Sequence, residues 1–196
     1  INSYVNSIEY GYSVTPQIFN SNTDDGVHQV NPDKSFASVG LGASSNGIMS
    51  SMMSTNIFYE LPNNMNMVEG QYELPANMNQ VDNQYDVVAG HWPENYNEVV
   101  AVLTPNGNVS DFMLYSMGLR DHKELEEMVR EFANEEEVQV PDGTLDLDYD
   151  DLTNVEFKLV NGADFYQYDS DYQVWKDKSG DADYMKSLVD NGETLK

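Results

Sequence analysis

Three histidines are the first residues of this chain to test for chemistry, because imidazole is a common metal ligand. His28, His91 and His122 are scattered along the sequence, and none has another His, or a Cys, at metal-ligand spacing. Isolated histidines of this kind are usually surface or turn residues, and we interpret them so. His91 is the exception of interest: it stands beside Trp92 in a polar loop, which makes the pair a candidate contact surface.

An acidic stretch, DLDYDD, resembles the first half of a calcium-binding loop through Asp146, Asp148 and Asp150. An EF-hand needs Gly at the sixth position and Glu at the twelfth. Here those positions hold Asp151 and Phe157, so an EF-hand is excluded. We interpret the stretch as a solvated acidic strand or turn, with a casual surface calcium site as the weaker alternative.

Methionines are concentrated in one part of the chain, where Met49, Met52 and Met53 lie close together. Their thioethers could bind Cu(I), because soft ligands suit a soft ion. They could equally form a flexible apolar surface for an oily ligand or a partner helix. Plain core packing is the favoured interpretation, and we keep the three residues as a second candidate contact surface.

Catalytic motifs are absent from the sequence. No GxSxG nucleophile elbow and no phosphate-binding loop occurs. Paired carboxylates are so frequent in this acidic chain that spacing alone identifies no glycosidase pair. We therefore predict a protein that is not an enzyme and that uses no cofactor and no metal.

Several segments have the period-two alternation or the β-branched runs that are typical of strands. The expected strands are 7–19, 27–30, 85–89, 99–103 and 154–160. A further segment, 164–176, predicts an aromatic hairpin that turns near Ser170 and carries Trp175, a third candidate contact residue. Residues 35–55 are expected to form a loosely packed loop.

Three helices are expected from capping signals and apolar spacing. Ser110 begins a short one that ends at Gly118, and 181–190 forms another before Gly192. The clearest begins at Asp121 and has an apolar stripe at i, i+3, i+4 and i+7, formed by Leu125, Met128, Val129 and Phe132. Strands and helices alternate without a regular βαβ rhythm, which favours the α+β class with a mixed sheet and short helices.

Charge is the strongest compositional signal: nine Lys and Arg against thirty-four Asp and Glu give a net charge of −25. This excess argues against nucleic-acid binding and against docking on anionic lipid. The chain begins at Ile1, has no signal peptide and has no run of about 20 apolar residues. We expect it to be an excised piece of a longer protein.

A local duplication precedes residue 86. Residues 60–72 and 73–85 agree at nine of thirteen positions. Repeat architectures use periods of roughly 20 residues or more and at least three copies. We therefore interpret the doubled unit as local padding and not as an array of ligand sites.

The segment QYDVVAGHWPENYNEVVAVLTPNGNVSDFMLYSMGLRD, residues 84–121, resembles the extracytoplasmic domain of MacB/FtsX-like ABC transporter permeases, especially those of Gram-positive bacteria. YVNSIEYGYSVTPQIF, VHQVNPD, EFKLVNGADFYQYD and YMKSLVDNGETLK are similar to other parts of that domain. The sequence departs from the family at His91, where relatives have Arg, and in the doubled unit, which relatives have once.

The resemblance implies a domain without an active site, between the first and second membrane helices, that transmits ATP-driven movement to the outside of the cell. It implies a cytoplasmic ATPase partner, a possible permease dimer and a parent protein in the cell membrane. It also implies a porter-like subdomain at 1–85, an inserted mixed α/β subdomain at 86–196, and a further strand after Lys196. The alternative is a secreted or surface-anchored module that binds peptide or carbohydrate through Trp92, Trp175 and the hairpin.

Overall fold

The computed structural model describes residues 15–32 and 85–196, except 105, 110, 142, 144 and 146. The methionines Met49, Met52 and Met53, the doubled unit and the predicted loop at 35–55 lie outside these residues. The first part of the strand predicted at 7–19 also lies outside them, as does Ser110, the predicted helix cap.

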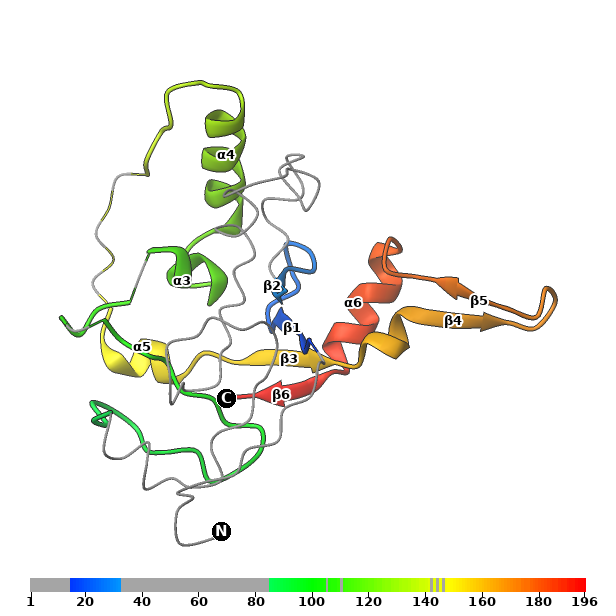
Figure 1. Ribbon diagram of the computed structural model, residues 1–196, viewed down its shortest axis with the longest axis horizontal. Helices are drawn as coiled ribbons and strands as arrows, with labels where there is room; N and C mark the ends of the chain where they lie inside the picture. The colour runs from blue at the N-terminus through cyan, green and yellow to red at the C-terminus, as the bar shows by residue number, and fades with distance from the viewer. Residues whose placement is uncertain are drawn as a thin grey trace, which may run out of the picture.

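A four-stranded antiparallel sheet forms the centre of the described chain, in the order β2-β1-β3-β6 (Figure 1). Its strands are β1 (Gln17–Asn20), β2 (Gln29–Asn31), β3 (Phe157–Val160) and β6 (Glu193–Leu195). Both β1 and β6 pair with β3 in antiparallel register, so they run parallel to each other on its two sides. The sheet thus joins strands from both predicted subdomain ranges, 1–85 and 86–196, and the division into subdomains stays a prediction.

The sheet is apolar on both faces, and helices cover each of them. Successive side chains of a strand point to opposite faces. Ile18 accordingly packs with Phe157 and Leu195 against Met117, which follows α3 (Asp111–Ser116). The opposite face carries a second cluster that packs on α6 (Ala182–Asp190) and consists of Phe19, Val160, Met185 and Val189.

Local signals account for the two longest helices. In α4 (His122–Ala133) the Asp121 carboxylate accepts a hydrogen bond from the Lys123 N–H at 2.9 Å and caps the first turn. Leu125 and Val129 are buried against Tyr115, as the stripe predicts. The stripe also predicts that Phe132 is buried, and this is wrong. Phe132 is 58% exposed, because the last turn of α4 extends beyond α3 (Figure 1). In α6 the prediction is confirmed, with Asp181 as its cap.

The acidic stretch contributes a helix and not the strand or turn expected from it. Asp148 caps α5 (Tyr149–Thr153) through a reciprocal box, in which its side chain accepts the Asp151 N–H and the Asp151 side chain accepts the Asp148 N–H. The carboxylates at the start of this helix therefore have a structural role, and they favour its N-terminal dipole.

Two predicted strands are wrong. Residues 85–89 and 99–103 have no strand conformation, and Val87, Val88 and Val102 are 46%, 59% and 46% exposed. The described part of the chain provides no strand that pairs along either run. A β-branched run becomes a strand only where a partner and a packed face are available.

The predicted aromatic hairpin is confirmed. A 3₁₀ turn, η1 (Gly162–Phe165), leads into β4 (Tyr166–Asp169), which pairs with β5 (Val174–Asp177). The hairpin projects away from the central sheet, and we call it the arm (Figure 1). The fold is therefore α+β, as the sequence predicts, but the predicted mixed sheet is wrong, because all strand pairs in the described chain are antiparallel. Among the described residues, no helix is both long and apolar enough to cross a membrane.

Candidate functional site

The predicted contact residues lie in separate places. His91 and Trp92 belong to the loop between residues 90 and 98, whereas Trp175 lies on the arm, far from that loop in Figure 1. The structure therefore does not bring the predicted residues into one surface. Two other arrangements emerge instead, one around the loop and one around the two remaining histidines.

The loop is closed by Glu98. Its carboxylate accepts hydrogen bonds from the backbone N–H of Glu94 at 2.7 Å and from the side-chain amide of Asn95 at 2.6 Å. These hydrogen bonds lower the pKa of Glu98 because they stabilise the ionised carboxylate. The side-chain amide of Asn95 has the largest effect, and the backbone N–H of Glu94 has the next largest. The segment PENYNE is thus a self-contained turn.

This turn is attached to the outer edge of β6. The Asn97 carbonyl accepts the Lys196 N–H at 2.9 Å, and the Val99 N–H donates to the Lys196 carbonyl at 2.7 Å. The Asn97 side chain donates to the Thr194 carbonyl at 3.1 Å, and the Tyr96 hydroxyl donates to the Glu193 carboxylate at 3.0 Å. The segment PENYNE is therefore attached by several hydrogen bonds to β6 and to Lys196, which follows it.

His91 is exposed at the entrance to this turn. Its Nδ1 lies 2.8 Å from the Trp92 carbonyl. That hydrogen bond is the main reason why the pKa of His91 is raised above its ordinary value, since the carbonyl oxygen stabilises the protonated, positively charged imidazole.

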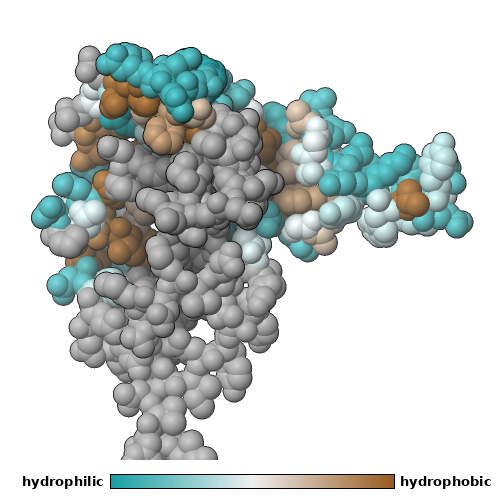
Figure 2. Space-filling model, turned by 45° about the horizontal axis from the view of Figure 1, so that its top comes forward, coloured by the Kyte–Doolittle hydropathy of each residue, from teal (hydrophilic) through white to brown (hydrophobic). Residues whose placement is uncertain are grey.

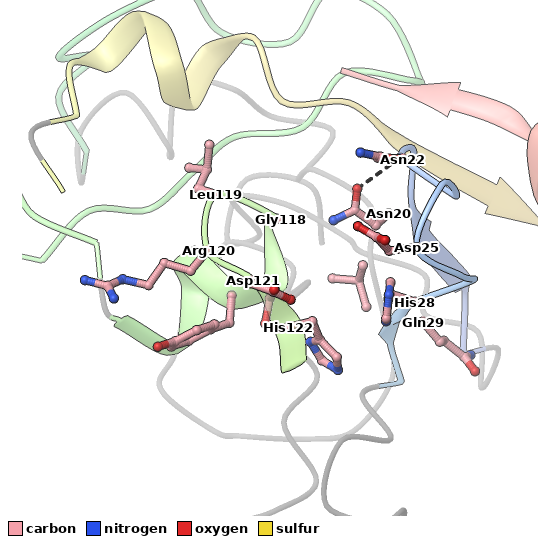
Figure 3. Close-up of a pocket in the computed structure, with 13 residues that line it drawn as sticks. Asn20, Asn22, Asp25, His28, Gln29, Gly118, Leu119, Arg120, Asp121 and His122 are labelled. Carbon is pink, nitrogen blue, oxygen red and sulfur yellow. Dashed lines mark hydrogen bonds between the residues drawn. The ribbon is translucent and has the colours of Figure 1, made fainter. Parts of the chain in front are cut away.

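A cavity of about 300 Å³ lies between the β1–β2 connection and the junction of α3 with α4 (Figure 3). The end of β1 contributes Asn20, the β1–β2 connection contributes Asp25 and His28, and the helix junction contributes Asp121 and His122. Figure 3 shows Arg120 turned away from the other labelled side chains, and its guanidinium donates to the Gly143 carbonyl. The lining is mixed: carboxylates and imidazoles lie on facing walls, beside the apolar groups of Val30, Tyr115 and Leu119.

His28 and His122 face each other across this cavity. Their ring centroids are 4.9 Å apart, at an interplanar angle of 51°. His122 Nε2 lies 3.7 Å from a Glu126 carboxylate oxygen, and Lys123 forms an ion pair with Asp25 at 3.8 Å. These contacts join the N-terminus of α4 to the β1–β2 connection.

No pattern in the sequence indicates this pair, because 93 residues lie between the two histidines and each is isolated in its own segment. Only the sheet, which places the β1–β2 connection beside the helix junction, brings them together. In the described residues, no three His, Asp or Glu side chains are arranged to hold a metal ion.

Burial lowers the pKa of His28, and the proximity of His122 lowers it further. Glu126 and Asp121 oppose these effects, and Lys123 reinforces them. A histidine whose folded-state pKa lies below its unfolded-state value binds protons more readily in the unfolded chain. The stability of the folded chain therefore falls as the pH drops below about 6.5, the ordinary histidine pKa, and levels off below the folded-state pKa.

Replacing His28 with Gln is expected to remove this acid sensitivity. The free energy of unfolding should be measured for wild type and His28→Gln by urea denaturation at several pH values between about 8 and about 5. This range spans the titration of an ordinary histidine. We expect the difference between the two proteins to be constant above neutral pH. Below it, the wild type should lose stability relative to the variant.

His91→Gln is the matched control, because the pKa of His91 is shifted in the opposite direction. A raised folded-state pKa contributes stability at low pH that is lost as the pH rises. The free energy of unfolding of wild type should therefore increase relative to that of His91→Gln as the pH is lowered. A pH-independent difference for His28→Gln would contradict a lowered pKa of His28 in the folded chain.

The last candidate contact residue, Trp175, lies on β5 and is 67% exposed. It packs against Tyr168 of β4, with ring centroids 5.3 Å apart. Comparison with known proteins adds no relative to these observations: no family model, no curated protein and no solved structure matches the chain.

Proposed function

We propose that this chain is a non-catalytic extracytoplasmic domain of a MacB/FtsX-like ABC transporter permease. In this function it transmits ATP-driven movement of the membrane helices to the outside of the cell. The proposal begins from the sequence resemblance at 84–121, whose segment PENYNE folds into the turn that is attached to β6.

The pairing of β1 and β6 with the same central strand is the observation that carries the proposal. Gln17 to Asn20 pair with Val160 to Phe157, and Glu193 to Leu195 pair with Leu159 to Phe157. In a domain inserted between two membrane helices, movement enters through the chain segments that lead to those helices. Here both segments would load β3 directly, so a displacement of one relative to the other would be passed to the whole sheet.

The proposal includes the partners and location that the resemblance implies. The parent permease would be embedded in the cell membrane, would pair with a cytoplasmic ATPase subunit and could form a permease dimer, with no nucleic-acid partner. The finer architecture, a porter-like subdomain at 1–85 and an inserted subdomain at 86–196, belongs to this proposal. The parallel arrangement of β1 and β6 supports it, because one more antiparallel strand after Lys196 would return the chain to the end where β1 begins.

The parent protein, expressed in its own host, provides the test. Ser170→Cys places a thiol at the exposed tip of the arm, in a chain that has no cysteine of its own. We expect a membrane-impermeant maleimide to label this variant in intact cells. Ser116→Cys, whose position is 9% exposed, should be labelled only after denaturation, and the wild-type parent controls for cysteines elsewhere.

Labelling alone does not separate a permease from a surface module, so the same membranes should be extracted with alkaline carbonate. We expect the parent to remain in the membrane and to purify in detergent with a subunit that hydrolyses ATP. Release by carbonate, without an ATPase subunit, would overturn the proposal. The alternative, a surface module that binds peptide or carbohydrate, would then be favoured by the exposed rings of the arm.

A further inference from the structure

One face of the arm is aromatic and open to solvent. Tyr168 lies directly opposite Trp175, and Tyr166 lies opposite Asp177, so these four side chains share a face of the ribbon. Tyr166, Tyr168 and Trp175 are 48%, 50% and 67% exposed. In Figure 2 the arm is coloured mostly teal and white, as expected for acidic residues together with Tyr and Trp, whose hydropathy is intermediate.

The arm is held in place at both ends. At its tip, the Asp169 carboxylate accepts the backbone N–H of Asp171 at 2.9 Å and of Tyr172 at 3.1 Å. At its base, the Lys178 N–H donates to the Phe165 carbonyl at 2.7 Å, and the Phe165 ring packs edge-on against the buried Phe19. A two-stranded ribbon is marginally stable alone, so these attachments are what present the rings in a fixed geometry. Rings that are fixed before binding lose little entropy in a complex.

The same region already holds two ammonium groups between a ring and a carboxylate. Lys176 lies 5.2 Å from the centre of the Tyr172 ring and forms an ion pair with Asp169. Lys178 lies 5.9 Å from the Tyr184 ring and 2.9 Å from Asp181. Both distances are within the range of cation–π attraction. The first of these sites lies on the arm and the second at its base beside α6, so rings and carboxylates of this region already bind lysine side chains.

We propose that the aromatic face of the arm, formed by Tyr166, Tyr168, Trp175 and Asp177, docks a Lys- or Arg-bearing polypeptide segment of another protein. The rings supply cation–π faces and apolar contact area, and Asp177 supplies a carboxylate beside them. This combination repeats, on the open face, what the chain does with its own lysines.

Charge identifies the occupant. Residues 162–181 contain five Asp and two Lys, and the whole chain has a net charge of −25. A second copy of the chain would be repelled, and an acidic partner likewise, whereas a basic segment is attracted before contact. A neutral carbohydrate could also stack on the rings, but it would gain nothing from this charge. The inference is independent of the transporter proposal, since it concerns what the arm binds and not where the parent protein resides.

The test uses the whole chain, labelled with ¹⁵N, and a short unstructured peptide of alternating Lys and Gly. We expect amide shifts that are confined to the arm and saturate with peptide. The variant Trp175→Ala leaves the net charge unchanged. We expect it to raise the dissociation constant about tenfold or more, as the removal of a central aromatic side chain does in other interfaces. Trp175→Phe should give an intermediate value. Trp92→Ala, the matched change at the other tryptophan, should leave the constant unchanged.

The controls separate a docking face from general attraction to an acidic protein. Equal binding by wild type and Trp175→Ala, with shifts spread over the whole chain, would overturn the proposal. Saturable binding of chitohexaose to the same face, with no preference for the Lys peptide over a matched Glu and Gly peptide, would also overturn it in favour of a carbohydrate site. The spectrum of each variant shows directly whether the hairpin remains folded.

Discussion

Replacing Phe19 with Ala is expected to destabilise the folded chain by about 3–5 kcal/mol, the cost of deleting a buried aromatic side chain. Phe19 is 2% exposed and packs with Val160, Met185 and Val189. Its ring also meets the Phe165 ring edge-on, with centroids 6.3 Å apart. The substitution therefore leaves a cavity where β1, α6 and the base of the arm meet. Urea denaturation, followed by far-ultraviolet circular dichroism, measures the loss.

Phe132→Ala is the matched control, because Phe132 lies at the end of α4 and is 58% exposed. We expect this variant to lose less than about 0.5 kcal/mol, which is usual for surface positions. A small loss in Phe19→Ala would show that the cluster between β1 and α6 contributes little. A separate early transition of β1, with α6 still folded, would show that the two halves of the sheet do not fold as one unit.

Replacing Gly192 with Ala is expected to cost about 1–3 kcal/mol, the usual range for inserting a methyl group into a packed site. A Cβ atom at this position would lie 2.9 Å from the Leu159 carbonyl oxygen and 3.1 Å from the Val189 carbonyl oxygen. Both are backbone atoms, one in β3 and one in α6, and neither can move away as a flexible side chain would. The variant should therefore separate α6 from the sheet, which the urea midpoint reports.

Gly180 provides the control for Gly192→Ala. A Cβ atom there has no neighbour within 4 Å, so Gly180→Ala should leave the free energy of unfolding within about 0.5 kcal/mol of wild type. If the two alanine variants were equally stable, the close approach of α6 to β3 at Gly192 would be contradicted.

The helices could be predicted because their signals are local. In α4 the capping aspartate is confirmed, and so is the apolar stripe except at Phe132; in α6 the apolar face of the predicted segment is confirmed. The strands depend on partners that are distant in sequence. The runs 85–89 and 99–103 have strand composition, but no strand of the described chain pairs along them, whereas β6 has three residues and was not predicted. Its pairing with β3 makes it a strand.

The same reasoning applies to the candidate sites. The aromatic hairpin was visible because alternating rings and a turn signal lie within 13 residues, 164–176. The pair of His28 and His122 was not, since no local pattern relates the β1–β2 connection to the start of α4. The role of PENYNE in attaching the loop to β6 was hidden for the same reason: its hydrogen bonds reach residues 193–196.

The order of pairing in the central sheet also constrains biosynthesis. Gln17 pairs with Val160, so β1 cannot pair with β3 until β3 has emerged from the ribosome. The pairing of β3 with β6 in turn requires that residues 193–195 have emerged. Pairings of such long sequence separation form late, because a large loop must be closed before they contribute. Until then Ile18 and Phe19, which become buried on opposite faces, are exposed on the nascent chain. The sheet therefore closes only after residues 193–195 have been synthesised, and β1 is a segment that needs protection from aggregation before that moment.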